Sequence, residues 1–131
     1  MTFNAPKFES VQRISDDRGK ITIFNLELDI PFESKRVFML TAVPSNTERG
    51  GHGHKKCQQY LVSLRGIWEI KFFSAQGQAS FQLNHESGGV LVPVDTYITM
   101  KPIEDHSVLC VFASEDYDPK DYFYEIPELI K

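Results

Sequence analysis

The sequence predicts an all-β fold, a sandwich or barrel of short strands. Apolar residues recur in short runs that are rich in β-branched and aromatic side chains. Gly, Pro, Asn and Asp separate these runs at close and regular spacing, which is typical of antiparallel all-β domains. The 131 residues include 10 Phe and suit one domain with a buried core, residues 1–131.

The order of the expected elements follows from alternation and turn residues. A hairpin is expected from strands 58–64 and 67–73, which Arg65-Gly66 joins. A turn at 75–78 is then expected to pair a further strand, 79–83, with 67–73. Pro93 is expected to mark a strand end or edge, because proline cannot donate to the ladder. Only one helical turn is expected, near 118–122. The other expected strands cover 20–28, 35–43, 90–94, 97–102 and 107–113.

Charge and hydropathy exclude several classes of protein. The formal net charge is −4, from 14 basic and 18 acidic side chains, which does not fit a general nucleic-acid binder with a basic stripe. No apolar run approaches the roughly 20 residues of a membrane span. Cys57 and Cys110 lie in apolar runs, and no secretory signal is recognisable. We therefore expect buried free thiols and a cytoplasmic location.

The segment RGGHGHKKCQQY, residues 49–60, contains the most informative pattern. Residues i and i+2 of a strand point to the same face, so His52 and His54 are expected to face one pocket. Gly53 between them places no side chain on the opposite face. Two neighbouring imidazoles suit metal binding, acid–base chemistry or, in the simplest case, a solvated turn.

The spacing of this segment resembles the first cupin motif, with His52, His54, Gln59 and Gly66 at the motif positions. Gln59 stands where that motif has its acidic metal ligand. In the second motif, LVPVDTYITM, the position of the further histidine ligand matches Ile98. Metal sites ordinarily take three or more protein ligands, so we expect no metal and no other cofactor.

Four segments in order resemble the WxcM-like sugar 3,4-ketoisomerases, small cupins related to the RmlC type. They are DDRGKI, IPFESKRVF, RGGHGHKKCQQ and ASEDYDPKDY, which together extend over nearly the whole chain. The resemblance implies an all-β, single-domain cupin, a jelly roll or double-stranded β-helix. It also implies a homodimer that acts on a dTDP-linked 4-oxo-6-deoxy sugar in deoxysugar biosynthesis for polysaccharides such as O-antigen.

The implied reaction moves a carbonyl from sugar C4 to C3 through an enediol(ate). His52 and His54 are the implied proton-transfer pair, with His54 as the main base. Substrate-binding candidates are Arg49 for the sugar oxygens or diphosphate, Gln59 for orientation, and Tyr97, Arg36, Lys55, Lys56 and Arg18 as further contacts.

Several pocket positions depart from the family pattern. Phe38 and Met39 occupy positions where the family commonly has tyrosines. Tyr97-Ile98 replaces a Trp-His pair that is common in the family, and Tyr124 lies where the family tends to have Arg. Two alternatives therefore stay open beside the isomerase. One is a related nucleotide-sugar epimerase, and the other is a non-catalytic cupin that binds a nucleotide sugar. For the dimer, strands around 11–14 and 21–26 are expected to complete a partner's sheet and hide its edge.

Overall fold

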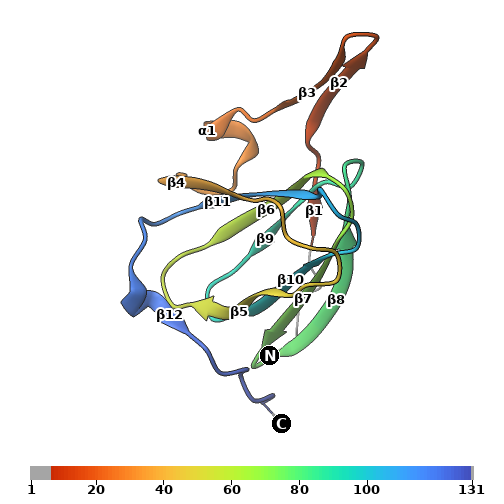
Figure 1. Cartoon of the computed structure of the whole chain (residues 1–131). Helices are drawn as coiled ribbons and strands as arrows, with labels where there is room; N and C mark the ends of the chain where they lie inside the picture. Colours follow the sequence, from red (N-terminus) through yellow and green to blue (C-terminus); the bar gives the residue numbers. More distant parts are fainter. Residues whose placement is uncertain (1–6, 131) are drawn as a thin grey trace.

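Two five-stranded antiparallel sheets lie face to face in the computed structural model, which describes residues 7–130 (Figure 1). The upper sheet of Figure 1 contains, in spatial order, β1 (Phe8–Glu9), β9 (Gly89–Val92), β6 (Gln59–Arg65), β11 (Val108–Ala113) and β4 (Arg36–Leu40). The lower sheet contains β12 (Tyr122–Phe123), β5 (Arg49–His54), β10 (Tyr97–Pro102), β7 (Trp68–Ser74) and β8 (Gly77–Leu83). This arrangement confirms the predicted all-β jelly roll.

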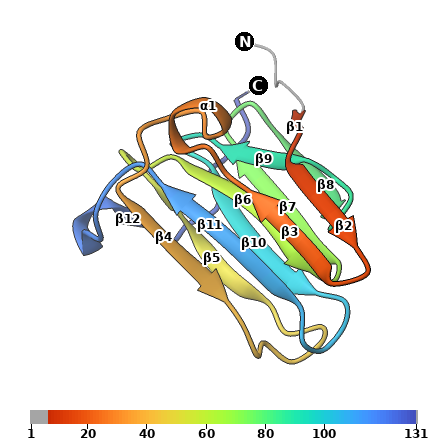
Figure 2. The same cartoon turned by 90° about the horizontal axis from the view of Figure 1, so that it is seen from above.

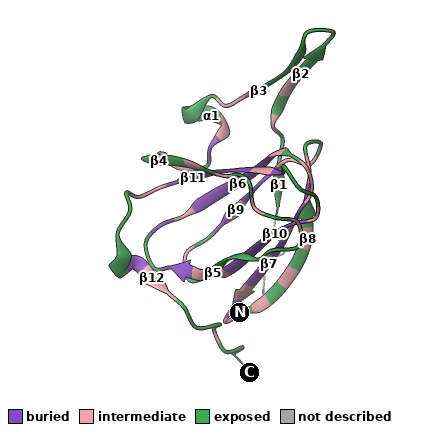
Figure 3. Cartoon of the chain, viewed as in Figure 1, coloured by how far each residue is buried: buried purple, intermediate pink, exposed green. Residues whose placement is uncertain are grey.

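The core fills the space between the sheets. Strand alternation places every second side chain of β7 inside, so Trp68, Ile70 and Phe72 are buried while their neighbours are half-exposed. Figure 3 shows a similar alternation along β8, the edge strand beside β7, where half-buried and exposed residues follow one another. Each fully buried side chain of this size contributes roughly 1.5–3 kcal/mol through removal of apolar area from water. The other members of this cluster are Leu61, Leu83, Val90, Val92, Ile98, Met100, Leu109 and Val111.

A second apolar layer covers the outer face of the upper sheet. Tyr60, Val62 and Phe112 point outward there and pack with Ile30 and Phe24, from the segment around α1 (Leu26–Asp29). Figure 2 shows α1 and the strands β2 (Gln12–Asp16) and β3 (Gly19–Ile23) on the near side of this sheet. The upper sheet is therefore covered by side chains on both faces.

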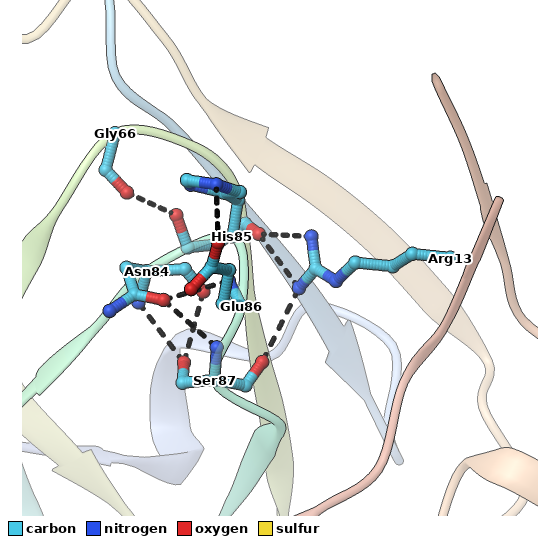
Figure 4. A network of polar contacts seen from close by, with 7 residues as sticks. Arg13, Gly66, Asn84, His85, Glu86 and Ser87 are labelled. Carbon is cyan, nitrogen blue, oxygen red and sulfur yellow. Dashed lines mark hydrogen bonds and ion pairs between the residues drawn. The ribbon is translucent and has the colours of Figure 1, made fainter. Parts of the chain in front are cut away.

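The strands β2 and β3 pair with each other and project from the body of the molecule (Figure 1). The Arg13 guanidinium holds the base of this hairpin by donating to the carbonyls of Ser63 (3.3 Å) and Ser87 (3.4 Å), as Figure 4 shows. Within residues 7–130 no helix is long and apolar enough to cross a membrane.

Two predicted elements are wrong. The strands β6 and β7 do not form a hairpin, because β6 pairs with β9 and β11 while β7 pairs with β8 and β10. The chain passes from one sheet to the other at Gly66, whose φ is +80°. The expected strand 20–28 ends at Ile23, because the Asn25 carbonyl accepts from the N–H groups of Leu28 and Asp29 and starts the helical turn α1.

Other predicted elements are confirmed with small shifts. The β7–β8 hairpin, β10 and β11 lie where expected, and β9 ends at Val92, just before Pro93. The expected strand 35–43 is shorter, because β4 ends at Leu40 and Ala42 has φ +55°. The predicted helical turn near 118–122 is η1 (Pro119–Asp121).

Gly66→Ala tests the sheet-to-sheet crossing. An added Cβ would clash with the Ser107 side chain, and a non-glycine residue at φ +80° is strained. We expect a loss of at least about 2 kcal/mol in the free energy of unfolding, measured by urea denaturation. Gly19→Ala is the matched control, since Gly19 also has a positive φ but nothing lies within 4 Å of its added Cβ. Equal losses in both variants would contradict the steric account.

Candidate active site

The histidine pair lies on β5, in the lower sheet and at the open end of the sandwich. The ring centroids of His52 and His54 are 5.2 Å apart, at an interplanar angle of 86°. The opposite face at Gly53 is filled by the Phe123 ring, which a Cβ would overlap. Glycine at this position is therefore required by close packing, and the histidines present their rings to one side.

Asp121 connects the C-terminal segment to the histidine strand. Its Oδ1 accepts from the N–H groups of Lys55 (2.9 Å) and Lys56 (2.6 Å), and its Oδ2 accepts from that of Cys57 (3.2 Å). Oδ2 also lies 2.9 Å from Nδ1 of His54. Asp118 caps the short helix η1, accepting from the N–H of Lys120 at 3.0 Å, and this local turn presents Asp121 to β5.

This contact fixes the tautomer of His54. An ionised carboxylate only accepts hydrogen bonds, so Nδ1 of His54 carries the proton and Nε2 carries the lone pair. Nε2 is buried and has no hydrogen-bond partner within residues 7–130. His54 is therefore oriented like an imidazole that can accept a proton at Nε2.

Burial keeps both imidazoles neutral. Burial is the largest effect lowering the pKa of His52, and the neighbouring His54 and Arg49 lower it further, while a hydrogen bond from the ring to the backbone of Gly50 raises it. Burial likewise lowers the pKa of His54, and the nearby charge of Arg36 adds to this effect. The Asp121 carboxylate opposes it without cancelling it. Both rings are thus free bases at neutral pH.

Asp121 itself stays ionised. Burial alone would raise its pKa, but the hydrogen bonds from the Lys56 N–H, the His54 ring and the Cys57 N–H outweigh burial and lower the pKa below its usual value. The dyad at neutral pH therefore consists of a neutral imidazole and a carboxylate.

A cavity of about 640 Å³ opens beside this pair, between β4 and β5. This volume is within the range of small-molecule sites. His52, Gln59 and Tyr122 form the polar part of its wall, with Arg36 and Arg49. The apolar part of the wall includes Phe38, Met39, Leu40, Val43, Met100 and Val111.

Two cations border the cavity without carboxylate partners. Within the described part of the chain, neither Arg36 nor Arg49 forms an ion pair. Nε of Arg36 is buried without a hydrogen-bond partner, and its guanidinium lies 5.3 Å from the centre of the Phe38 ring. An unpaired, partly desolvated guanidinium is a strong site for phosphate or enolate oxygens.

Tyr122 links the two histidines and the cavity. Its ring centroid is 4.8 Å from that of His52 and 4.3 Å from that of His54, and its backbone pairs with His54 in the β5–β12 ladder. Tyr117 and Tyr124 flank it at 5.9 and 6.1 Å. Sequence reasoning missed Asp121 and Tyr122 as site residues, although both belong to the recognised ASEDYDPKDY segment.

The structure brings together about half of the predicted site residues. Arg36, Arg49, His52 and Gln59 line the cavity, whereas His54 lies behind His52 and is only 4% exposed. The side chain of the pair that lines the cavity is therefore His52, whereas the sequence pattern led us to expect His54 as the main base.

Three predicted substrate contacts lie elsewhere in this chain. Arg18 is at the tip of the β2–β3 hairpin, 90% exposed and paired with Asp16. Lys55 forms an exposed ion pair with Asp95, because the residue after His54 turns away from the sheet. Tyr97 packs on Phe73 at 5.9 Å and is not part of the cavity wall. Ile98 is fully buried in the core opposite His52, and Lys56 is exposed.

His54, Cys57 and Asp121 bring three potential metal-ligand atoms within 4.8 Å of one another. Both Asp121 oxygens already accept two hydrogen bonds each, and the Cys57 thiol donates to the Gln58 carbonyl at 3.3 Å. A cation there would have to displace these bonds. The donor set therefore fits a hydrogen-bonded cluster better than a metal centre.

The fold and site together define a proton-transfer site for an anionic small molecule: neutral imidazoles beside unpaired arginines. The chain belongs to the WxcM-like family, since the family profile described as "FdtA: WxcM-like, C-terminal" matches residues 4–131. It is 29% identical over 116 residues to a TDP-4-oxo-6-deoxy-alpha-D-glucose-3,4-oxoisomerase from Aneurinibacillus thermoaerophilus, covering 88% of this chain and 84% of the relative.

Solved structures give the same assignment. A histidine-to-asparagine mutant of the 3,4-ketoisomerase QdtA from Thermoanaerobacterium thermosaccharolyticum, in complex with TDP-4-keto-6-deoxyglucose, superposes with a TM-score of 0.85. It is 32% identical, and the match covers 95% of this chain and 90% of that one. The RmlC epimerase of Mycobacterium tuberculosis, 12% identical with a TM-score of 0.72 over 91% of this chain and 66% of its own, shares the cupin fold.

Asp121→Asn tests the carboxylate cluster. An amide cannot accept from all four donors, so we expect a loss of at least about 2 kcal/mol in the free energy of unfolding, because buried charge-assisted bonds contribute about 1.5–3 kcal/mol each. Urea denaturation measures it. The control is Asp95→Asn, where an exposed ion pair is removed and the loss should stay below about 1 kcal/mol. Comparable losses in the two variants would contradict the account.

The lowered pKa values also predict a pH dependence of stability. The folded state holds His52 and His54 below their ordinary pKa of 6.5, so the unfolded state binds more protons once the pH falls below about 6.5. The free energy of unfolding should therefore decrease between pH 6.5 and the lowered pKa values. Asp121 titrates below 3.8 and does not contribute to this window.

His52→Gln should flatten this pH dependence, measured by urea denaturation at a series of pH values between 7.5 and 5. His85→Gln, which removes an exposed histidine, is the control and should leave the slope unchanged. A His52→Gln profile identical to that of the unmodified protein would show that the ring is not held neutral by the fold.

Proposed function

We propose that the protein is a nucleotide-sugar 3,4-ketoisomerase that acts on a dTDP-linked 4-oxo-6-deoxy hexose. The observation that carries the proposal is a neutral imidazole, His52, on the wall of a cavity that also contains Arg36 and Arg49, with the neutral ring of His54 packed behind it. The relative from Aneurinibacillus thermoaerophilus is a 3,4-oxoisomerase, and the mutant of the 3,4-ketoisomerase QdtA was solved in complex with TDP-4-keto-6-deoxyglucose. Family membership and site chemistry therefore agree.

His52 is the proposed base at the sugar carbons. The C3 proton is acidic because it is adjacent to the C4 carbonyl, and a neutral imidazole at the cavity wall can remove it. The C–H electron pair forms the C3=C4 bond of an enediol(ate). The same imidazolium returns the proton to C4 as the carbonyl forms at C3. One group on one face of the sugar thus performs both transfers.

His54 and Asp121 support this base. The ring of His54 contacts that of His52, and the Asp121 carboxylate holds it as the Nδ1–H tautomer. We assign His54 a positioning role, with its Nε2 lone pair directed away from Asp121. The sequence-based preference for His54 as the main base is replaced by His52, because His52 borders the cavity.

Arg36 and Arg49 are the proposed anion-binding groups. A guanidinium bonds the oxygens of a diphosphate in a bidentate manner, and the same charge stabilises an enediolate. Gln59 is 4% exposed and lines the cavity, where its amide can orient a sugar hydroxyl. No metal enters this proposal, because Gln59 and Ile98 occupy the positions where the cupin motifs supply further ligands.

The assembly and location are also proposals. Apolar side chains are exposed on the β2–β3 hairpin, on α1 and on the edge strand β4, and a second copy of the chain would cover them. They include Ile14, Ile21, Leu28 and Val37, which are 46%, 58%, 83% and 48% exposed. We propose a homodimer. Cys57 and Cys110 are free and buried, which suits the reducing cytoplasm.

Turnover in deuterated water tests the function. With dTDP-4-oxo-6-deoxyglucose we expect a 3-oxo product, followed by NMR, with deuterium entering at C3 or C4. His52→Asn should lower kcat at least about 100-fold, the usual contribution of a general base. His85→Asn, an exposed histidine in the loop after β8, is the control and should retain full activity.

The position of deuterium in the sugar distinguishes the isomerase from an epimerase and from a binding protein without activity. Deuterium at C3 or C5 with the carbonyl still at C4 would indicate an epimerase. Tight dTDP-sugar binding without turnover would indicate a binding protein, and either result would overturn the isomerase proposal.

A further inference from the structure

Moving a carbonyl from C4 to C3 requires oxygen-bound protons to move as well as the carbon-bound one. The C4 oxygen must gain a proton, and the C3 hydroxyl must lose one. His52 is occupied with the carbon-bound proton in the proposed mechanism, so a second group on the cavity wall has to serve the oxygens. This inference rests on the proposed function and extends it.

The cavity wall offers few groups that can exchange a proton. Arg36 and Arg49 act only as hydrogen-bond donors, and the amide of Gln59 neither gains nor loses a proton readily. Phe38 and Met39 on β4 have no exchangeable proton at all. Among the described residues that line the cavity, Tyr122 is the one whose side chain is a phenol.

The position of Tyr122 is determined from three sides. Its ring lies against both imidazoles, at 4.8 and 4.3 Å between centroids, and Tyr124 stacks on it at 6.1 Å with an interplanar angle of 18°. The preceding residue, Asp121, is held by four hydrogen bonds to the β5–β6 connection and His54. Within residues 7–130 the Tyr122 hydroxyl forms no hydrogen bond that would compete with a ligand. Packing of the ring therefore fixes the position of the Tyr122 side chain, and its hydroxyl oxygen is available to bond a ligand.

We propose that Tyr122 is a catalytic residue that moves the oxygen-bound proton. As His52 removes the C3 proton and the C3=C4 bond forms, the Tyr122 hydroxyl protonates the C4 oxygen and becomes a phenolate. The phenolate then takes the proton of the C3 hydroxyl, the C3 carbonyl forms, and the C3=C4 electron pair takes the proton from the His52 imidazolium at C4. All protons are accounted for, and both side chains end in their starting states.

The proposal accounts for the loss of phenols on β4. Phe38 and Met39 place apolar groups on the wall opposite β5, where the resembling family commonly has tyrosines. The phenol that lines the cavity of this chain is that of Tyr122 on β12, beside the histidines.

Tyr122→Phe removes the hydroxyl and keeps the ring packing. We expect kcat for isomerisation to fall at least about 100-fold, with KM and the affinity for dTDP, measured by calorimetry, changed less than about threefold. Tyr124→Phe and Tyr117→Phe remove hydroxyls from the two flanking tyrosines, which do not line the cavity, and should keep kcat within about threefold.

The outcomes separate this inference from the proposed function. If the unmodified protein isomerises the sugar and Tyr122→Phe does so at a similar rate, the assignment of Tyr122 is overturned while the isomerase proposal stands. An equal loss in Tyr124→Phe would also overturn it, because the effect would then belong to the aromatic stack. If the unmodified protein does not isomerise the sugar at all, the proposed function itself fails.

Discussion

The Asp121 carboxylate is the interaction on which the rest of the site depends. It accepts three backbone N–H groups from residues 55–57 and the Nδ1–H of His54, and is itself only 7% exposed. Through these bonds the segment after β11 crosses the open end of the sandwich and adds β12 to the lower sheet (Figure 1). The same segment delivers Tyr122 to the histidine pair. One buried acid therefore fixes a strand, a tautomer and an aromatic ring.

The charge distribution of the site depends on which charged side chains have partners. Asp121 is compensated by its donors, so its charge does not protonate His54, and burial keeps both imidazoles neutral. Within residues 7–130 Arg36 and Arg49 form no ion pair, so their charge acts on whatever enters the cavity that they line. Uncompensated cations beside neutral bases favour binding of an anionic substrate. They also stabilise the negative charge of an enediolate more than the neutral ketone from which it forms. This division of roles is what the proposed chemistry requires.

Local patterns predicted the fold class and the histidine pair, because both depend on residues close in sequence. Alternation predicted most strands, and the i, i+2 spacing of His52 and His54 placed their rings together. Which distant strands pair with each other could not be predicted from local sequence. Arg65-Gly66 has the composition of a hairpin turn, but it leads the chain from one sheet to the other.

The remaining site residues depend on tertiary contacts. Asp121 is 67 residues from His54 along the chain, so its role follows only from the folded topology. Arg18, Lys55 and Tyr97 lie away from the cavity of their own chain. Polar or aromatic character alone does not say which side of a strand or which end of a hairpin faces the cavity. His52 and His54 share a face, and only the neighbouring Tyr122 and Asp121 decide which of them borders the open space.

The most direct test of this account is the protonation state of the His54 ring, measured by ¹⁵N NMR of the imidazole nitrogens at neutral pH. We expect a neutral ring with the proton on Nδ1 and an unprotonated Nε2, because the Asp121 carboxylate accepts from Nδ1. In Asp121→Asn this preference should weaken. A His54 ring that is doubly protonated at neutral pH, or neutral with its proton on Nε2, would contradict the central claim.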